Sequence, residues 1–150
     1  MAKSEADDPA RSQPLLGSWD LVYYEQVLPS GEVLRPFGDS PSGLILYQTG
    51  GRMSAQLSVG NPARFASADL AEAGGEEIAE RWRTYFGYWG RFEIDANKQV
   101  VIHHVEGSSF PNWIGTKQER HFRFEGANRL VLETQSPSGR YKVIWQRRVD

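Results

Sequence analysis

The 150-residue sequence predicts an all-β domain, an antiparallel barrel or sandwich of eight or more short strands with one amphipathic helix inserted. Two observations favour this fold class. Apolar and polar side chains alternate over many short segments, as they do in strands with one buried face, and turn-forming residues separate these segments. Residues 76–86 depart from the alternation and repeat their large apolar residues at helical spacing.

The first strand is expected at residues 18–28, where Trp19, Leu21 and Tyr23 share a face because neighbouring side chains on a strand point to opposite sides. We place Trp19 inside the barrel, which predicts that Tyr23 also points inward. The other strands expected from the alternation are 33–35, 44–48, 53–59, 88–95, 100–107, 115–125, 130–134 and 141–147.

The inserted helix is expected over residues 76–86. Ile78, Trp82, Tyr85 and Phe86 lie at offsets of four, seven and eight, which places them on one helical face. Charged residues occupy most of the other positions. An apolar face must be covered, and an open end of the barrel is the natural place for it.

Composition excludes several classes of protein. The net charge is −2 and no run of Lys and Arg occurs, so the electrostatic signature of a nucleic-acid-binding protein is missing. The absence of cysteine excludes disulfides, thiolate catalysis and cysteine-based zinc sites, and it fits a cytoplasmic location. No apolar run approaches the ~18 residues of a membrane span. Residues 1–14 lack the apolar centre of a signal peptide, so we expect a disordered tail followed by the domain at 15–150.

Several short motifs carry a family resemblance. Trp19 in the first strand and Arg147 in the last resemble the calycin pattern, in which a Trp near the closed end of the barrel packs under an Arg from a late strand. The other motifs are LGSW at 16–19, PFG at 36–38, PSG at 41–43 followed by Tyr47, GRMSA at 51–55, YWGRF at 88–92, HHV at 103–105, FPNWIG at 110–115, and Arg120 two residues before Phe122.

In this order the motifs resemble the bacterial and fungal lipocalin-like domain family over residues 15–147. The resemblance implies an antiparallel lipocalin-like barrel of about 8–10 strands. It implies little about function, because fold analogy is only a prior for function. Some members of the family lie beside secondary-metabolite genes, which points to secondary metabolism.

A barrel of about eight strands is wide enough either to be filled by side chains or to hold one small ligand. Small residues at Ala55 and Gly90 leave room beside large neighbours, which favours a cavity. Ligand pockets are mainly apolar with a few placed polar groups. The candidate ligand-binding residues that fit this description are Tyr23, Tyr47, Met53, Tyr88, His103, Trp113 and Arg120.

His103 and His104 are neighbours on one strand, so only one of them can point inward. Val101, His103 and Val105 form the more apolar set, which favours His103 as the inward residue. One interpretation gives His103 a ligand hydrogen bond or a role as general acid or base. The other makes it a core histidine bonded to a Tyr or a backbone carbonyl.

Arg120 alternates with Phe122 and Phe124 and is therefore expected to point into the barrel. A buried Arg is costly unless it is paired. A structural role is favoured, in which Arg120 stacks on Trp19 or Trp145 or pairs with a Glu at the closed end. The alternative is that Arg120 holds a carboxylate, enolate or carbonyl oxygen of a ligand.

Trp113 follows Pro and Asn in a segment expected to be a loop. It either lines the mouth of the barrel beside Trp82 and Tyr85, or it seals the hydrophobic core. The sequence gives no preference between these two interpretations.

The leading hypothesis is a module that binds a small, largely apolar molecule without a cofactor. No phosphate loop, HExxH motif or nucleophile elbow is present, and two adjacent histidines on a strand do not share a face, so neither metal nor haem is expected. The alternative is a biosynthetic isomerase, cyclase or dehydratase that uses His103 on a polyketide- or terpenoid-like substrate. A third hypothesis is an interaction domain with a solid core, whose edge at 33–35 mediates homodimers.

Overall fold

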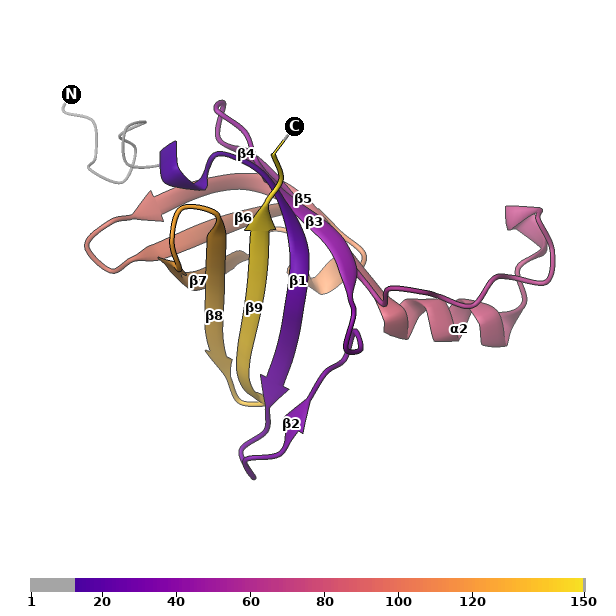
Figure 1. The fold of residues 1–150 in the computed structure, drawn as a ribbon. Helices are drawn as coiled ribbons and strands as arrows, with labels where there is room; N and C mark the ends of the chain where they lie inside the picture. The colour runs from indigo at the N-terminus through magenta and orange to yellow at the C-terminus, as the bar shows by residue number, and fades with distance from the viewer. Residues whose placement is uncertain (1–12, 150) are drawn as a thin grey trace.

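The computed structural model describes residues 13–149 and shows eight antiparallel strands closed into a barrel, with a ninth strand outside it (Figure 1). The expected all-β barrel is therefore confirmed. Residues 1–12 lie outside the described residues, so the N-terminal tail stays a prediction. The strands are β1 (Gly17–Val27), β2 (Val33–Leu34), β3 (Ser42–Tyr47), β4 (Arg52–Ser58), β5 (Tyr85–Asp95), β6 (Val100–Ser108), β7 (Lys117–Phe124), β8 (Arg129–Ser136) and β9 (Gly139–Arg147).

Sequential strands pair from β3 to β9, and β1 closes the sheet by pairing with β3 on one side and β9 on the other. β2 pairs only with the end of β1 and therefore stays outside the barrel. Within residues 13–149, no helix has the length and apolar character required to cross a membrane. The helical segments are η2 (Gln13–Leu15), η3 (Leu70–Glu72), α2 (Gly75–Thr84) and η4 (Pro111–Trp113).

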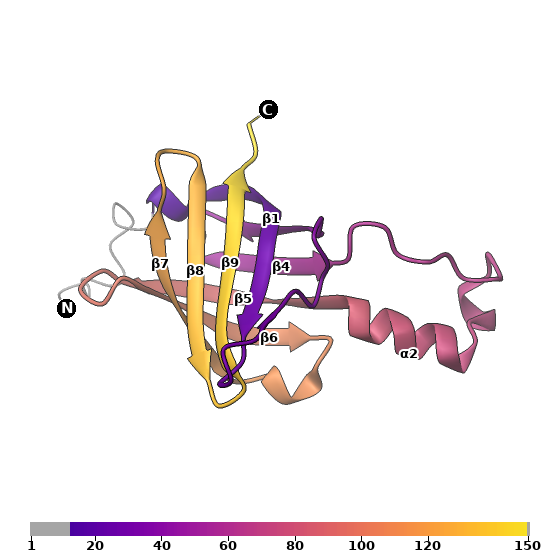
Figure 2. The same cartoon turned by 60° about the horizontal axis from the view of Figure 1, so that its bottom comes forward.

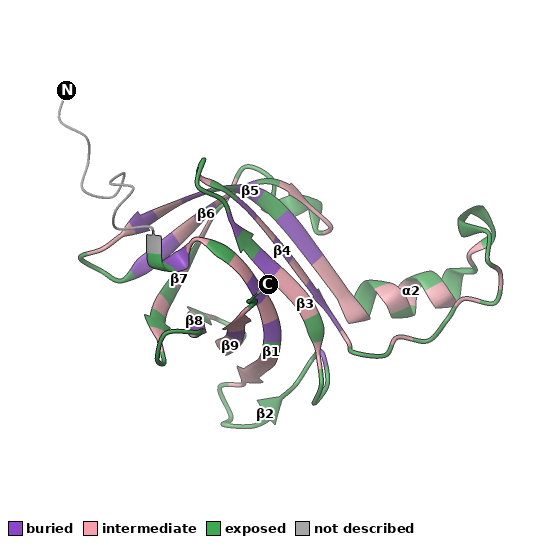
Figure 3. Cartoon of the chain, turned by 45° about the horizontal axis from the view of Figure 1, so that its top comes forward, coloured by how far each residue is buried: buried purple, intermediate pink, exposed green. Residues whose placement is uncertain are grey.

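The inward faces of the strands follow the expected alternation over most of the barrel, as the banding of buried and exposed residues in Figure 3 shows. On β6, Val101 and His103 are fully buried and Val105 nearly so, while His104 lies on the outer face. Alternation places one side of each strand inside the closed sheet. The expected inward face of this strand is confirmed.

The first strand contains a β-bulge that reverses its alternation. Leu21 pairs with Trp145 and Tyr23 with Ile144, so Val22 is an extra residue on β1. An extra residue shifts every following side chain to the other face. Tyr24 therefore packs against the core beside Phe37.

The prediction that Tyr23 points inward is wrong, because of this bulge. Tyr23 lies outside the barrel, where its hydroxyl donates to Glu25 and its ring lies 5.4 Å from the Arg35 guanidinium.

The helix α2 is shorter than expected and does not cover the barrel. It ends at Thr84, because Tyr85 and Phe86 pair with Ser58 and Leu57 of β4. The connection over residues 59–74, between β4 and α2, projects away from the barrel together with α2 (Figures 1 and 2). Ile78 and Trp82 are 52% and 55% exposed, so the helix does not close the barrel end, although Trp82 near its C-terminus borders the cavity described below.

One end of the barrel is closed around Trp19. The Trp19 indole is fully buried and donates its N–H to the Leu15 carbonyl, and the Arg147 guanidinium lies 4.1 Å above its ring. Arg147 also donates to the carbonyls of Leu16 and Pro14 at 2.8 and 2.6 Å. The arrangement expected from the calycin resemblance is present, and it ties the N-terminal segment to the last strand.

We expect Arg147→Ala to lower the free energy of unfolding by about 2–3 kcal/mol, because it removes a cation–π contact and two charge-assisted hydrogen bonds. Arg147→Lys should recover less than half of this loss, since Lys lacks the planar fork of donors. Urea denaturation measures both. Arg148→Ala is the control: its exposed pair with Asp20 should contribute less than about 1 kcal/mol. Equal losses for the two alanine variants would contradict the role given to Arg147.

Candidate functional site

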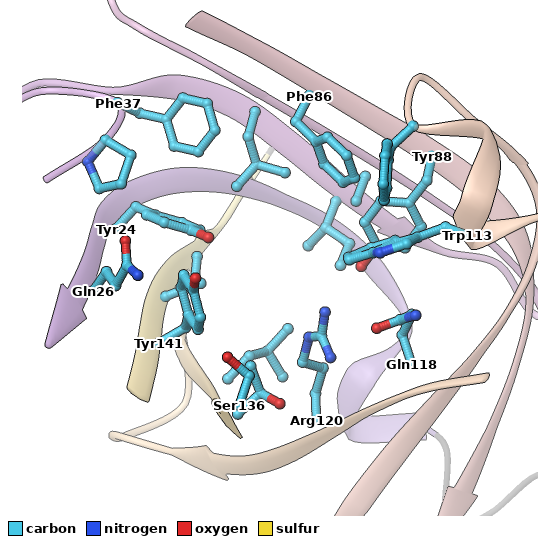
Figure 4. A pocket seen from close by; sticks show the side chains of 18 of the residues that line it. Tyr24, Gln26, Phe37, Phe86, Tyr88, Trp113, Gln118, Arg120, Ser136 and Tyr141 are labelled. Atoms are coloured by element: carbon cyan, nitrogen blue, oxygen red, sulfur yellow. The ribbon is translucent and has the colours of Figure 1, made fainter. Parts of the chain in front are cut away.

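The barrel contains a cavity of about 960 Å³ whose lining includes Trp82 of α2 and Trp113 of η4. Figure 4 shows side chains of its wall. This volume lies at the upper end of the range for small-molecule pockets. The cavity that the sequence favoured is therefore present, and the solid core of the third hypothesis is contradicted. Apolar and aromatic side chains from six strands and the β2–β3 loop form most of the wall, namely Tyr24, Phe37, Ile45, Ala55, Leu57, Phe86, Tyr88, Leu132, Tyr141, Val143 and Trp145.

Three aromatic rings meet at one side of the cavity. The centroids of Phe86 and Tyr88 lie 4.9 and 5.2 Å from that of Trp113, and both pairs are edge-to-face. η4 holds Trp113, whose ring is half-buried, over the barrel wall. Such rings offer flat apolar surface to a ligand at little cost in conformational entropy. Trp113 lines the cavity, as one of its two interpretations expected.

The Arg120 side chain rises from β7 into the middle of the cavity, as Figure 4 shows. Its guanidinium lies 5.7 Å from the Trp113 ring centroid and donates one hydrogen bond, to the Glu119 carbonyl at 3.0 Å. Among residues 13–149, no carboxylate lies within 4 Å of this guanidinium. Most of its five donors therefore remain free for another partner.

The structural role favoured for Arg120 is wrong. Arg147, not Arg120, stacks on Trp19 at the closed end. The Arg120 guanidinium instead faces the cavity, which is the arrangement that the alternative interpretation expected.

Tyr24 directs its hydroxyl toward the cavity from β1 (Figure 4). Within the described part of the chain this hydroxyl has no hydrogen-bond partner. Burial raises the pKa of Tyr24 well above its ordinary value, so the phenol is neutral at every physiological pH. Tyr24 can therefore donate to a ligand oxygen.

His103 lies beneath the cavity in a closed hydrogen-bonded group. Its Nε2 is 2.7 Å from the Tyr47 hydroxyl and its Nδ1 is 2.8 Å from the Tyr88 hydroxyl. Burial, with smaller contributions from Arg120 and His104, lowers the pKa of His103 from 6.5 to about 3. The imidazole is neutral, so it donates to one hydroxyl and accepts from the other.

This environment is the core arrangement that sequence reasoning weighed as the second interpretation of His103. Both ring nitrogens are occupied by protein groups, and His103 does not line the cavity.

The structure brings together only some of the predicted ligand-binding residues. Tyr88, Trp113 and Arg120 line the cavity. Tyr47, Met53 and His103 point inward but are buried in the packed part of the barrel. Tyr23 lies outside it, as described above.

Several lining residues were not predicted from the sequence, among them the polar residues Tyr24, Gln118 and Tyr141, which Figure 4 labels. Alternation from Arg120 identifies Gln118, and alternation from Trp145 identifies Tyr141. No local signal identifies Tyr24, because its direction depends on the bulge at Val22. Within residues 13–149, no cluster of three His, Asp or Glu side chains is suited to hold a metal ion.

Comparisons with known proteins agree with the barrel. The model of the Lipocalin-like domain family matches residues 16–148. The chain is 37% identical over 91 residues to the 4'-hydroxy-3'-methoxypropiophenone carrier protein ppsC of Aspergillus oryzae (strain ATCC 42149 / RIB 40). The matched region covers 57% of this chain and 81% of that protein.

Two designed proteins are among the similar solved structures. A redesigned β-barrel has a TM-score of 0.46 and 9% identity, covering 98% of this chain and 100% of that one. A de novo designed fluorescence-activating β-barrel has a TM-score of 0.46 and 12% identity, covering 91% and 96%.

The buried neutral His103 predicts a pH-dependent stability. Its pKa is about 3 in the folded state and near 6.5 in the unfolded state, so the unfolded state binds the proton more readily. The stability that the neutral His103 imidazole contributes is present above the unfolded-state pKa near 6.5 and is lost as the pH falls below it. Between pH 7.5 and 5.5 the free energy of unfolding should fall by about 1.4 kcal/mol on account of His103.

Urea denaturation at pH 7.5 and at pH 5.5 measures this fall. In His103→Gln the free energy of unfolding should fall by about 1.4 kcal/mol less than in wild type. His121→Gln, which alters an exposed histidine, is the matched control and should show the same fall as wild type. An NMR titration of the wild type provides a test without variants. A His103 imidazole that titrates above pH 5 would contradict the prediction.

Proposed function

The chain belongs to the Lipocalin-like domain family, and we propose that it is a carrier that holds a small, largely apolar aromatic molecule inside its barrel. The observation that carries this proposal is the cavity of about 960 Å³ with its cluster of Phe86, Tyr88 and Trp113. Burying one aromatic ring removes about 150–250 Å² from water, which provides most of the affinity at about 25 cal/mol per Å².

The relative from Aspergillus oryzae supports an aromatic ligand. The name of that protein describes a carrier of an aryl ketone with hydroxyl and methoxy substituents. A ring of this kind can pack against the aromatic cluster of Tyr88 and Trp113, and the polar groups of Arg120 and Tyr24 belong to the same cavity wall. An apolar pocket with a few placed polar groups is the usual form of a small-molecule site.

The enzyme hypothesis receives no support from the geometry of His103. A general acid or base must reach the reacting group directly or through one water. Both nitrogens of His103 are bonded to Tyr47 and Tyr88, and its low pKa opposes uptake of a proton near neutral pH. We therefore favour binding and transfer of an unchanged molecule over an isomerase, cyclase or dehydratase activity.

Three further expectations stay predictions. They are a role in secondary metabolism, a cytoplasmic location, and homodimer formation through the edge at 33–35. Homodimers would form through the strand β2, which pairs with β1 on one side and in which Val33 is 51% exposed. Size-exclusion chromatography with light scattering tests it.

We expect Trp113→Ala to weaken binding of 4'-hydroxy-3'-methoxypropiophenone about tenfold, because the ligand loses an aromatic contact. Isothermal titration calorimetry measures this. Trp89→Ala is the control, since Trp89 lies on the outer face of β5 and should leave the affinity unchanged. Mass spectrometry after incubation should return the ligand unaltered. A new product that also forms with His103→Gln would exclude His103, and one lost in that variant would favour the enzyme hypothesis.

A further inference from the structure

We propose that the cavity selects the anionic form of an acidic aromatic ligand, whose negatively charged oxygen forms an ion pair with Arg120. The ligand class is a planar ring that carries one ionisable oxygen, either an acidic phenol or an aryl carboxylate. The inference rests on the proposed carrier function and adds to it a requirement for charge.

The first argument is the isolation of Arg120. A guanidinium that leaves water needs an opposite charge or a full set of hydrogen bonds, and without them its burial is costly. Arg120 is half-buried, faces the cavity and donates a single hydrogen bond, to a backbone carbonyl. Arg123 and Arg147, by contrast, each donate two hydrogen bonds, to carboxylates and to backbone carbonyls respectively. Arg120 therefore has the free donors of a binding group.

The second argument is that the neighbours of Arg120 cannot supply the missing negative charge. Tyr24 of β1, Tyr47 of β3 and Tyr88 of β5 all have raised pKa values because of burial, so they stay neutral. His103 of β6 is neutral as well. The Tyr141 hydroxyl of β9 is already hydrogen-bonded to the Ser138 hydroxyl at 2.9 Å.

The third argument is the charge balance of the cavity wall. On β7, Lys117, Glu119 and His121 occupy the exposed, outward positions, and Arg120 is the charged residue of this strand that occupies an inward one. Arg83 of α2 borders the cavity, but it pairs with Glu80. The charge that β7 directs into the cavity is therefore positive. A cavity of this sign attracts anions.

Further donors surround the same space. The Trp145 indole N–H is buried without a partner among the described residues, and Trp145 belongs to the cavity wall. Tyr24 adds a free hydroxyl. Buried donors are nearly always satisfied in folded proteins, so an unpaired one beside a cavity is a mark of a missing partner. An oxygen-bearing ligand can supply acceptors for this group of donors.

The proposal is tested with matched probes by calorimetry on the full-length protein. The first pair is 4'-hydroxy-3'-methoxypropiophenone and its neutral methyl ether, 3',4'-dimethoxypropiophenone. The second pair is an aryl carboxylate, 4-hydroxy-3-methoxybenzoate, and its methyl ester. We expect the anion of at least one pair to bind about tenfold more tightly than its neutral partner, and the pair that does so identifies the kind of oxygen.

The pH dependence separates ionisation of the ligand from titration of the protein. Affinity for the phenol should rise as the pH passes upward through the phenol's own pKa. Affinity for the carboxylate should stay constant between about pH 6 and 9, where a carboxylate is already ionised. Affinity for the two neutral probes should also stay constant. These comparisons use only the wild-type protein, so they hold even if a variant fails to fold.

Arg120→Met should remove the preference for the anion and leave affinity for the neutral ether within about twofold. Arg140→Met is the matched control, because it removes the same charge from an exposed position of β9 outside this cavity. Equal binding of both members of each pair to wild type would overturn the charge requirement alone. An equal loss of affinity for the anion in Arg120→Met and Arg140→Met would also overturn it. If no aromatic probe binds, the carrier function itself fails, and the inference fails with it.

Discussion

The pairing of β1 with β9 closes the sheet, and the rest of the molecule depends on it. Without this ladder the inward face of each strand would be exposed to water, and no cavity would form. The same ladder contains the bulge at Val22, which turns Tyr24 toward the interior while Trp19 remains buried at the closed end. Because of this bulge, side chains from opposite faces of the first strand point inward. Trp19 before the bulge packs in the core, and Tyr24 after it lines the cavity.

Sequence patterns predicted the fold and several inward residues, because strand alternation is a local property. Tyr88, His103 and Arg120 point inward as their neighbours indicated. The direction of Tyr23 could not be predicted, since a bulge arises from pairing between segments more than a hundred residues apart. The end of α2 was missed for a related reason, because pairing with β4 overrode the helical spacing that Tyr85 and its neighbours display.

The roles of the two inward polar residues depend on what surrounds them, and only the structure supplies that. His103 is enclosed by two hydroxyls and belongs to the packed core of the barrel. Arg120 has a single hydrogen bond and faces open space. The sequence left two interpretations of the histidine open and favoured a structural role for Arg120 at the closed end. The packing gives that structural role to Arg147, which stacks on Trp19.

The excursion between β4 and β5 leaves and rejoins the barrel at Ser58 and Tyr85, which are paired with each other. The two ends of this excursion are therefore held together by the sheet, whatever the length of chain between them. Lengthening such a loop adds little entropic cost, since the cost grows only with the logarithm of its length. Evolution and protein engineering can thus vary this segment, or graft another domain into it, while the barrel and its cavity keep their geometry.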